Sequence, residues 1–464
     1  MSSSQNSNQF KLYLLESSLF LFNFATVLSS SLLLNQLLKQ FCIQFGYEKS
    51  LCDVISENNN STADIEEELQ SHVTNIILLK NILNSSVPAI LQLFLGPWSD
   101  KNGRKKVMNF SSIGFVLTHT SIAAVCYYSD YINPLNPWIY IICYIPVNFL
   151  GGFASMSTAI ICYITDNCEE SKRSFHFIII KYMNNFSFVF GVLSCSFILN
   201  FSNPTVLYTI AAICTILGKF IITISVDESV QIIENSRTTL MSILSFGHII
   251  EMIKTCFMPR IFYGRSILLC LILTMALNKF TSACWENVGY LFARETLNWT
   301  LEEQNYLDAS TFAIASFGTF FSIYVFQTNL GFSDIILISF AIFGSFIDFI
   351  LRAFANQSWQ MYAISFISCM KMIVNPLCRS LISLVISKNE MGKVMSFTSS
   401  VDSLAVVIAS PIFISIYQAT YTTFAGAFFL VCAAICFVNL FIVFYVMIAK
   451  QITSNIKNKY IEIE

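Results

Sequence analysis

Long apolar stretches recur along this chain and constrain its fold more than any other feature of the sequence. A helix that crosses a bilayer needs about 20 mostly apolar residues. Only 12% of the 464 residues are charged, whereas a soluble domain carries roughly 25%, so the composition excludes a soluble protein. We therefore predict an all-α membrane protein with twelve transmembrane helices, near 12–38, 74–97, 107–128, 138–165, 176–200, 205–226, 265–292, 306–328, 333–354, 359–387, 394–418 and 421–449.

The positions of the basic residues predict how the chain crosses the membrane. Of its 26 Lys and Arg residues, sixteen fall in the ends and loops on one side of the predicted spans, and six lie inside spans. The other four lie on or near the opposite side: Lys39, Lys49, Arg294 and Arg352. Because basic residues collect in cytoplasmic loops, we expect both termini in the cytoplasm, which an even number of spans allows.

The connection over 227–264 is the longest on the predicted cytoplasmic side, and six spans lie on each side of it. It separates a predicted N-terminal six-helix bundle, 1–226, from a C-terminal six-helix bundle, 265–449. Residues 450–464 form a predicted cytoplasmic tail. This tail ends in Tyr460-Ile-Glu-Ile463, which fits a tyrosine-based sorting signal. We therefore expect either the plasma membrane or an endolysosomal membrane.

The most specific local pattern lies between the second and third spans, Gly96-Pro-Trp-Ser-Asp100-Lys101-Asn-Gly103-Arg104-Lys105-Lys106. Gly96 allows two helices to approach closely, and Gly103 supplies backbone freedom that a residue with a Cβ would resist. Asp100 can accept hydrogen bonds at a neighbouring helix N-terminus. The alternative is an ordinary basic loop that anchors helices by charge alone, but charge explains neither the glycines nor the aspartate.

This loop resembles the signature motif between helices 2 and 3 of major facilitator superfamily transporters. The resemblance implies two six-helix bundles related by a pseudo-two-fold axis and a secondary transport mechanism with alternating access. It also implies a cytoplasmic gate, whose residues here would be Gly96, Asp100, Gly103, Arg104 and Asp166. Asp166 lies at the inner end of helix 4, where it can pair with Arg104.

A narrower resemblance covers most of the chain. The stretches Tyr163-Ile-Thr-Asp166 and Asn375-Pro376-Leu-Cys-Arg379 are similar to the solute carriers related to the proton-coupled folate transporter. Members of that family move folates, other organic anions or small cell-wall-derived ligands, often with protons. The resemblance therefore implies a small-molecule cargo, such as a folate-like organic anion, and possible coupling to protons.

The chain departs from this family where proton coupling is concerned. The coupling glutamate of helix 5 corresponds to Lys181 here, and a helix 7 histidine falls near Phe280. The family also links its first outer loop to the loop between helices 7 and 8 by a disulfide. This sequence offers Cys52 at one end of that link but Asn298 at the other. These departures argue against ordinary folate–proton symport and leave transport itself intact.

Charges deep inside the predicted spans indicate where cargo binds, because a buried ion must pair, face water or hold a ligand. Lys279 and Lys371 lie near the centres of helices 7 and 10. Arg379 lies in helix 10, roughly 12 Å from its cytoplasmic end at 1.5 Å per residue. These three deep cations are the predicted substrate-binding residues. Since they outnumber the deep carboxylates, we expect the cargo to be an organic anion.

Two carboxylates are candidates for proton coupling. Asp402 lies in helix 11 at the same depth as Arg379, and the two helices are neighbours in a major facilitator fold, so the side chains can pair. Glu286 lies in the outer third of helix 7 and is the second candidate. A static structural ion pair between Arg379 and Asp402 is an equally open alternative.

Several features of the predicted outer loops suggest modification. Asn59 and Asn60 in the loop 39–73 and Asn298 beyond helix 7 begin glycosylation acceptor patterns on the correct face. Cys42 and Cys52 flank the start of the same outer loop and can pair locally. The sequence leaves open whether they do.

The chain shows no arrangement of residues that points to an enzyme. No catalytic triad, paired catalytic carboxylates or phosphate-binding loop is present, and the fifteen cysteines have no metal-ligand spacing. We expect no cofactor, no metal and no nucleic-acid partner, and a monomeric transport unit in the lipid bilayer. Two other function classes stay open: a drug or cation antiporter, and a non-transporting ligand-binding protein on a transporter fold.

Overall fold

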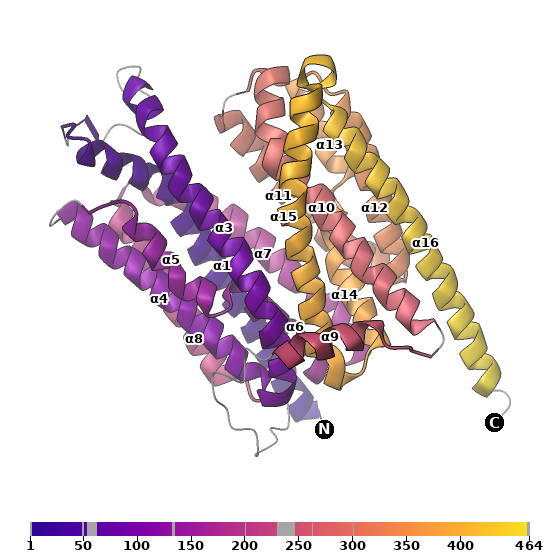
Figure 1. Cartoon of the computed structure of the whole chain (residues 1–464). Coiled ribbons are helices and arrows are strands. Elements are labelled where there is room, and N and C mark those ends of the chain that lie inside the picture. The colour runs from indigo at the N-terminus through magenta and orange to yellow at the C-terminus, as the bar shows by residue number, and fades with distance from the viewer. Residues whose placement is uncertain are drawn as a thin grey trace. The chain divides into compact units, whose positions relative to one another are not determined.

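The computed structural model describes residues 2–48, 51–52, 63–131, 135–199, 201–229, 246–261, 263–299 and 301–461, and every regular element within them is helical (Figure 1). The long elements are α1 (Ser2–Gln44), α3 (Ala63–Asn102), α4 (Arg104–Tyr131), α5 (Ile139–Phe149), α6 (Gly152–Asn167), α7 (Glu170–Leu199), α8 (Pro204–Ser225), α9 (Phe246–Phe257), α10 (Gly264–Leu297), α11 (Leu301–Phe321), α12 (Asp334–Ala353), α13 (Ser358–Ile367), α14 (Val374–Val385), α15 (Met391–Phe424) and α16 (Ala427–Ile461). A π-helix, η2 (Ser322–Asn329), continues α11, and two short 3₁₀ turns are η3 (Lys371–Ile373) and η4 (Lys388–Glu390).

The helices are long and apolar enough to cross a membrane, as the sequence predicts. Within the described residues there are eleven candidate spans, or twelve when the bent pair Ser358–Ile367 and Lys371–Val385 is counted as one. This confirms the predicted class of an all-α membrane protein. Asn59, Asn60 and Ile463 lie outside the described residues.

One predicted span is interrupted where the sequence indicates a continuous helix. The segment predicted at 359–387 bends by 47° between α13 and η3, so Lys371 lies at a break and not at the centre of a helix. At the break, the Ser368 hydroxyl donates to a carboxylate oxygen of Asp348 at 2.9 Å. Pro376 follows within about one turn of the break. Its ring clashes with the carbonyl of Met372 and it has no N–H to donate, so this proline is the local sequence signal for a kink here.

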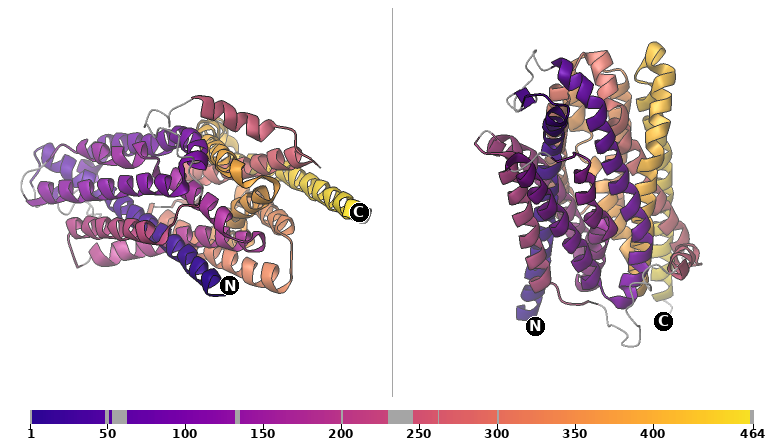
Figure 2. Two further views of the ribbon diagram at one scale, coloured as in Figure 1. Left: turned by 90° about the horizontal axis from the view of Figure 1, so that it is seen from below. Right: turned by 60° about the vertical axis from the view of Figure 1, so that its left-hand side comes forward.

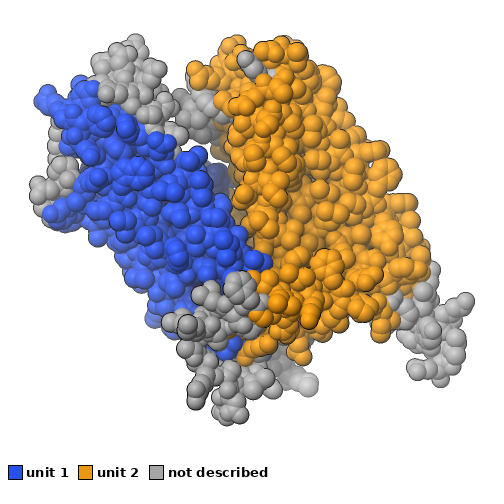
Figure 3. Space-filling model, in the orientation of Figure 1, with its two compact units in different colours: residues 1–95, 102–160, 186–234 blue, residues 96–101, 161–185, 235–464 orange. Residues whose placement is uncertain are grey.

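The chain forms two compact units, and the boundary does not simply halve the sequence (Figure 3). Unit 1 contains residues 1–95, 102–160 and 186–234, and unit 2 contains 96–101, 161–185 and 235–464. Part of the signature loop and the first half of α7 therefore group with the C-terminal helices. The predicted domain boundaries, at 226, 264 and 449, stay a prediction.

In unit 1, α1 and α4 both pack along α8. A partly buried carboxylate, Asp130 of α4, joins these helices. It accepts a hydrogen bond from the Thr205 hydroxyl of α8 at 3.0 Å and lies 3.7 Å from the ammonium of Lys39 in α1. Lys39, expected on the outer side, is thus part of a network between helices.

In unit 2, α10, α12, α15 and α16 surround an aromatic core. Phe292, Phe413, Phe428 and Phe429 are completely buried there. The rings of Phe292 and Phe429 are 5.2 Å apart and nearly perpendicular, an arrangement that aromatic pairs favour.

A buried ion pair borders this core within α12. The Arg352 guanidinium donates from Nε to both oxygens of Asp348, at 3.1 and 3.0 Å, and the two side chains are only 6% and 4% exposed. Arg352 also donates to the Ser365 hydroxyl at 3.0 Å and lies over the Trp285 ring. Arg352, expected from the sequence on or near the outer side, is instead buried, because its partner Asp348 lies one turn earlier on the same helix face.

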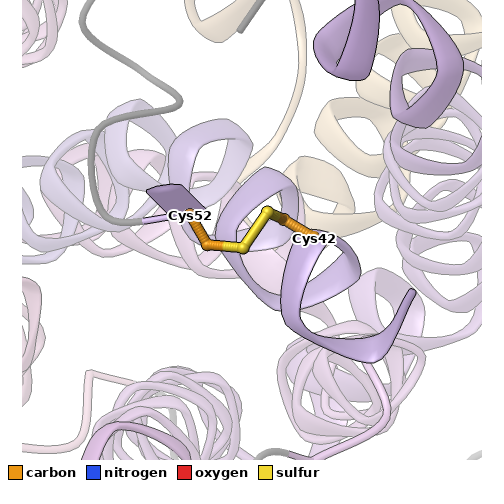
Figure 4. Close-up of a disulfide and its surroundings, with 2 residues drawn as sticks. All are labelled: Cys42 and Cys52. Atoms are coloured by element: carbon orange, nitrogen blue, oxygen red, sulfur yellow. A yellow bond between two sulfur atoms is a disulfide. The ribbon is translucent and has the colours of Figure 1, made fainter. Parts of the chain in front are cut away.

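The cysteine pairing that the sequence left open is settled. Cys42 at the end of α1 and Cys52 form a disulfide, with their Cα atoms 5.7 Å apart (Figure 4). Cys52 is therefore not free to form the disulfide that the resemblance implied, from the first outer loop to the loop that contains Asn298.

The connection predicted over 227–264 contains a helix. α9 runs crosswise to the long helices of its unit and is seen end-on in the right-hand view (Figure 2). It packs against α15 and α10 through buried residues that include Met252 and Cys256. Ile250, Ile253 and Phe257 on its other face are exposed. Such an amphipathic helix beside the start of a membrane span is typical of one that lies at a bilayer surface.

The Asp348–Arg352 pair gives a prediction about stability. Asp348→Ala leaves a buried guanidinium without its counter-charge, so we expect the free energy of unfolding to fall by about 3–5 kcal/mol. Chemical unfolding of the detergent-solubilised protein measures this. The double variant Asp348→Leu with Arg352→Met should recover most of the loss; a single variant as stable as the unchanged protein would contradict the structural role.

Candidate functional site

The signature loop begins at a tight contact between α3 and α15. A Cβ on Gly96 would lie 1.7 Å from Ser396 Oγ and 2.7 Å from the carbonyl oxygen of Gly392. These distances are far shorter than any real contact, so only glycine permits the approach. The close packing that the sequence predicted for Gly96 is therefore present at this position.

Asp100 caps a helix from a distant part of the chain. One carboxylate oxygen accepts the backbone N–H of Gly392 at 2.9 Å, and the other accepts that of Lys393 at 3.0 Å. Both N–H groups belong to the first turn of α15, where they lack partners within the helix. The carboxylate also opposes the partial positive charge of the helix N-terminus.

A second acidic residue caps α4 in unit 1. Glu228 accepts the backbone N–H of Arg104 at 2.7 Å. Gly103 adopts a φ of +109°, which favours glycine. A Cβ there would lie 2.2 Å from the Glu228 carboxylate, so that flexible side chain would have to shift. Gly103 is recognisable in the sequence, whereas Glu228 is not, because it lies 124 residues from Arg104.

A third acidic residue, Glu251 of α9, connects the signature loop with α15 by charge. Its carboxylate accepts hydrogen bonds from Lys393 Nζ at 2.8 Å and from Lys101 Nζ at 3.0 Å. The hydrogen bond from Lys393 is the main cause of a lowered pKa for Glu251, with a smaller contribution from Lys101. Sequence reasoning missed this residue, although it is the only acidic residue of an amphipathic helix in a basic region.

The predicted partner of Arg104 lies in the other unit. Arg104 is almost completely buried in unit 1, whereas Asp166, near the end of α6, is half-buried in unit 2. Their pairing as a gate stays a prediction.

Arg379 of α14 and Asp402 of α15 are brought together inside unit 2. Arg379 Nη2 lies 3.4 Å from Asp402 Oδ2 and donates to the Ser399 hydroxyl at 3.0 Å. The side chains are 14% and 8% exposed. Asn375 faces the same carboxylate and interacts with it, and its Oδ1 accepts a hydrogen bond from Asn278 Nδ2 at 2.8 Å.

The remaining predicted charges fall into two groups. Lys279 of α10 is partly buried and interacts electrostatically with Asp402. Lys371 instead lies among Asp348, Arg352 and Asp308, whose carboxylate accepts the indole N–H of Trp285. Of the three predicted substrate-binding cations, Lys279 and Arg379 therefore interact with Asp402, whereas Lys371 interacts with a different set of charges.

The other predicted sites are exposed. The Glu286 side chain of α10 is exposed. Asn298, the predicted glycosylation site, is exposed just after α10 and has a φ of +55°.

Comparison with known proteins agrees with this architecture. The Major Facilitator Superfamily family model matches residues 61–284. The crystal structure of the human organic anion transporter MFSD10 superposes with a TM-score of 0.69 at 14% identity, covering 94% of this chain and 99% of that one. The signature loop, the spans and these matches point to one conclusion. The chain resembles the transporters of the major facilitator superfamily and has their fold.

Three relatives resemble this transporter over most of its length. A probable peptidoglycan muropeptide transporter, SLC46, of Drosophila melanogaster is 28% identical, covering 90% of this chain and 82% of that protein. The lysosomal proton-coupled steroid conjugate and bile acid symporter SLC46A3 of Gallus gallus is 24% identical, covering 93% of each. The proton-coupled folate transporter of Bos taurus is 22% identical, covering 90% and 88%.

These findings confirm three interpretations from the sequence. The transporter has the major facilitator fold, it resembles the solute-carrier family of the folate transporter, and it is a secondary transporter of small organic solutes and not an enzyme.

Asp100 gives a prediction about transport. Asp100→Asn removes the negative charge and one of two acceptors at the start of α15, so we expect uptake to slow by about tenfold, equivalent to about 1.4 kcal/mol. Initial uptake rates, normalised to surface protein, measure the effect. Lys106→Ala, in the same loop, serves as control. Unchanged uptake by Asp100→Asn would show that the cap does not affect the transport cycle.

Glu251 gives a prediction about pH. Its folded-state pKa is lowered, so its stabilising contribution is present above the ordinary value near 4.5 and is lost only as pH falls through the lower folded-state pKa. Glu251→Gln should therefore change uptake by the same factor at pH 5.5 and pH 7.5, and by no more than about fivefold for an exposed ion pair. A changed shape of the pH profile would be the contrary result.

Proposed function

We propose that this transporter moves small organic anions across the membrane, coupled to protons, by alternating access. The relatives named above support the class of cargo. One is named for muropeptides, another for steroid conjugates and bile acids, and a third for folate. Two of these names also state proton coupling.

The observation that carries the proposal is the Arg379–Asp402 pair. A guanidinium is a strong ligand for carboxylate and phosphate groups because its N–H donors match their geometry. Here Asp402 occupies only part of that donor set at 3.4 Å, and the pair lies inside membrane-spanning helices. An anionic cargo can therefore compete with Asp402 for Arg379.

Proton coupling follows from this competition. When Asp402 is ionised, it neutralises Arg379 and weakens the attraction for cargo. When Asp402 takes up a proton, the arginine is released to bind an anion, with Lys279 adding a second positive charge nearby. One proton and the cargo are then bound together. Glu286 is the second candidate for the proton site.

We place both termini in the cytoplasm, as the distribution of basic residues favours. Segments 1–226 and 265–449 then form the two six-helix bundles of a monomeric transport unit, with the gate residues on the cytoplasmic side. The lysosomal relative supports an endolysosomal membrane, and the plasma membrane is the alternative location.

The role of the pair can be tested by uptake. Arg379→Ala should reduce the uptake of organic anions by about tenfold or more at every pH, since removing one member of a close charge pair costs about 2–5 kcal/mol. Asp402→Asn imitates the protonated state and should flatten the rise of uptake between pH 7.5 and pH 5.5. Proteoliposomes with a panel of labelled organic anions provide the measurement.

Leu404→Ala on α15, whose side chain is exposed, is the matched control for expression and reconstitution. A steep acid optimum that persists in Asp402→Asn would place the proton site elsewhere, and Glu286→Gln would then be examined. Uptake of organic cations with no uptake of anions would overturn the proposed cargo class.

A further inference from the structure

α9 lies at the level where two candidate membrane spans begin. The span of α10 begins at Gly264, shortly after α9 ends, and the span of α15 begins at Met391. α9 packs against both of these helices and runs crosswise to them (Figure 2). Its Glu251 accepts a hydrogen bond from Lys393, in the first turn of α15, at 2.8 Å. α9 therefore lies beside the ends of these spans, where hydrocarbon meets water.

The exposed face of α9 carries an apolar stripe, which consists of Ile250, Ile253 and Phe257. These residues are 55%, 43% and 51% exposed. Their spacing of three and four residues places them on one side of the helix. Another side packs on α15 and α10 through Met252 and Cys256, which are completely buried. A helix placed in this way can insert its exposed stripe at the boundary between lipid headgroups and acyl chains.

Two exposed basic side chains of this segment have no carboxylate partner among the residues that the structure describes. They are Lys254 of α9 and Arg265 in the first turn of α10. The carboxylate of Glu251 is already bonded to two lysines, and that of Glu390, just before α15, pairs with Arg260 at 3.0 Å. Lysine and arginine beside an apolar surface extend their charged ends to the headgroup level. This segment therefore presents positive charge that its own carboxylates do not neutralise.

This charge indicates what covers the stripe. In the orientation proposed above, α9 lies on the cytoplasmic side with the basic residues of the signature loop. The cytoplasmic leaflet carries anionic phospholipids, which attract lysine and arginine side chains near its surface. A zwitterionic lipid offers acyl chains to the stripe but no net charge to the two cations. An anionic phospholipid satisfies both.

We propose that α9 binds anionic phospholipids of the cytoplasmic leaflet, with the apolar stripe among the acyl chains and Lys254 and Arg265 on the headgroups. This contact holds Glu251 where it bonds Lys101 of the signature loop and Lys393 of α15. Anionic lipid thus stabilises the junction that Asp100 also forms, and it is a ligand distinct from the cargo.

Lipid binding to the purified full-length protein tests this without requiring transport. The delipidated protein is titrated with dioleoylphosphatidylserine or with dioleoylphosphatidylcholine, which has the same acyl chains and no net charge, and bound lipid is counted by native mass spectrometry. We expect the anionic lipid to bind about 25-fold more tightly at its strongest site, about fivefold for each of the two cations. Equal dissociation constants for the two lipids would overturn the inference.

Variants then assign the preference to α9 and the start of α10. Lys254→Gln together with Arg265→Gln should remove the preference for the anionic lipid, while binding of phosphatidylcholine changes little. Lys254→Arg together with Arg265→Lys keeps both charges and should keep the preference. Arg294→Gln is the matched control, because Arg294 is also an exposed arginine of α10 but lies in its last turn. A preference that persists without the two charges, or that the control removes, would refute the assignment.

Proteoliposomes test the link to the signature loop. Adding phosphatidylserine to phosphatidylcholine vesicles should raise the initial uptake of a labelled organic anion by about two- to fivefold, the range for an exposed ion pair. Glu251→Gln should abolish this increase and keep the binding preference, because Glu251 lies between the lipid contact and the loop. An increase that persists in Glu251→Gln would contradict the link.

The outcome separates this inference from the proposed function. If phosphatidylserine binds through Lys254 and Arg265 but no labelled anion enters proteoliposomes, the lipid site stands and the transport proposal fails. If anions are taken up equally in both kinds of vesicle and phosphatidylserine binds no better than phosphatidylcholine, the transport proposal stands and the lipid site fails.

Discussion

Hydrocarbon cannot hydrogen-bond to a polypeptide, and the rest of this structure depends on that constraint. Each spanning segment must satisfy its backbone internally, so every regular element of the described residues is helical. Where a helix is interrupted inside a span, a polar side chain lies at the break, as Ser368 does against Asp348. Where a charge is buried, another charge lies beside it, as in the Asp348–Arg352 pair.

Sequence reasoning succeeded where a pattern is local and failed where a contact joins distant segments. Long apolar runs identify spans because the bilayer imposes their length. The glycines and the aspartate of the signature loop have fixed spacing, so a helix-capping role for Asp100 could be predicted. Glu228 and Glu251 could not, since the partner of each lies more than 100 residues away in the sequence. The break near Lys371 is accompanied by a local helix breaker, Pro376, and by the contact of Ser368 with Asp348, of which only the proline can be recognised in the sequence.

The deep charges were only partly assigned from the sequence. Depth along a helix places Arg379 and Asp402 at one level, and the structure brings them together. Depth says nothing about the direction of a side chain, so Lys279 and Lys371 were grouped although they lie in different surroundings. Lys181 was noted only as a departure from a family pattern.

The way in which Asp100 binds α15 has a consequence for how this protein can diverge. The carboxylate contacts main-chain N–H groups, which every residue except proline possesses. Gly392 and Lys393 donate through their main chain, so these hydrogen bonds place no constraint on the side chains at the two positions. The position of Asp100, by contrast, must keep a carboxylate. The side chain of Lys393 is constrained separately, by its hydrogen bond to Glu251. A comparison of many descendants of this chain would find an invariant acidic residue opposite a variable helix start, and covariation between the two would be weak even though they touch.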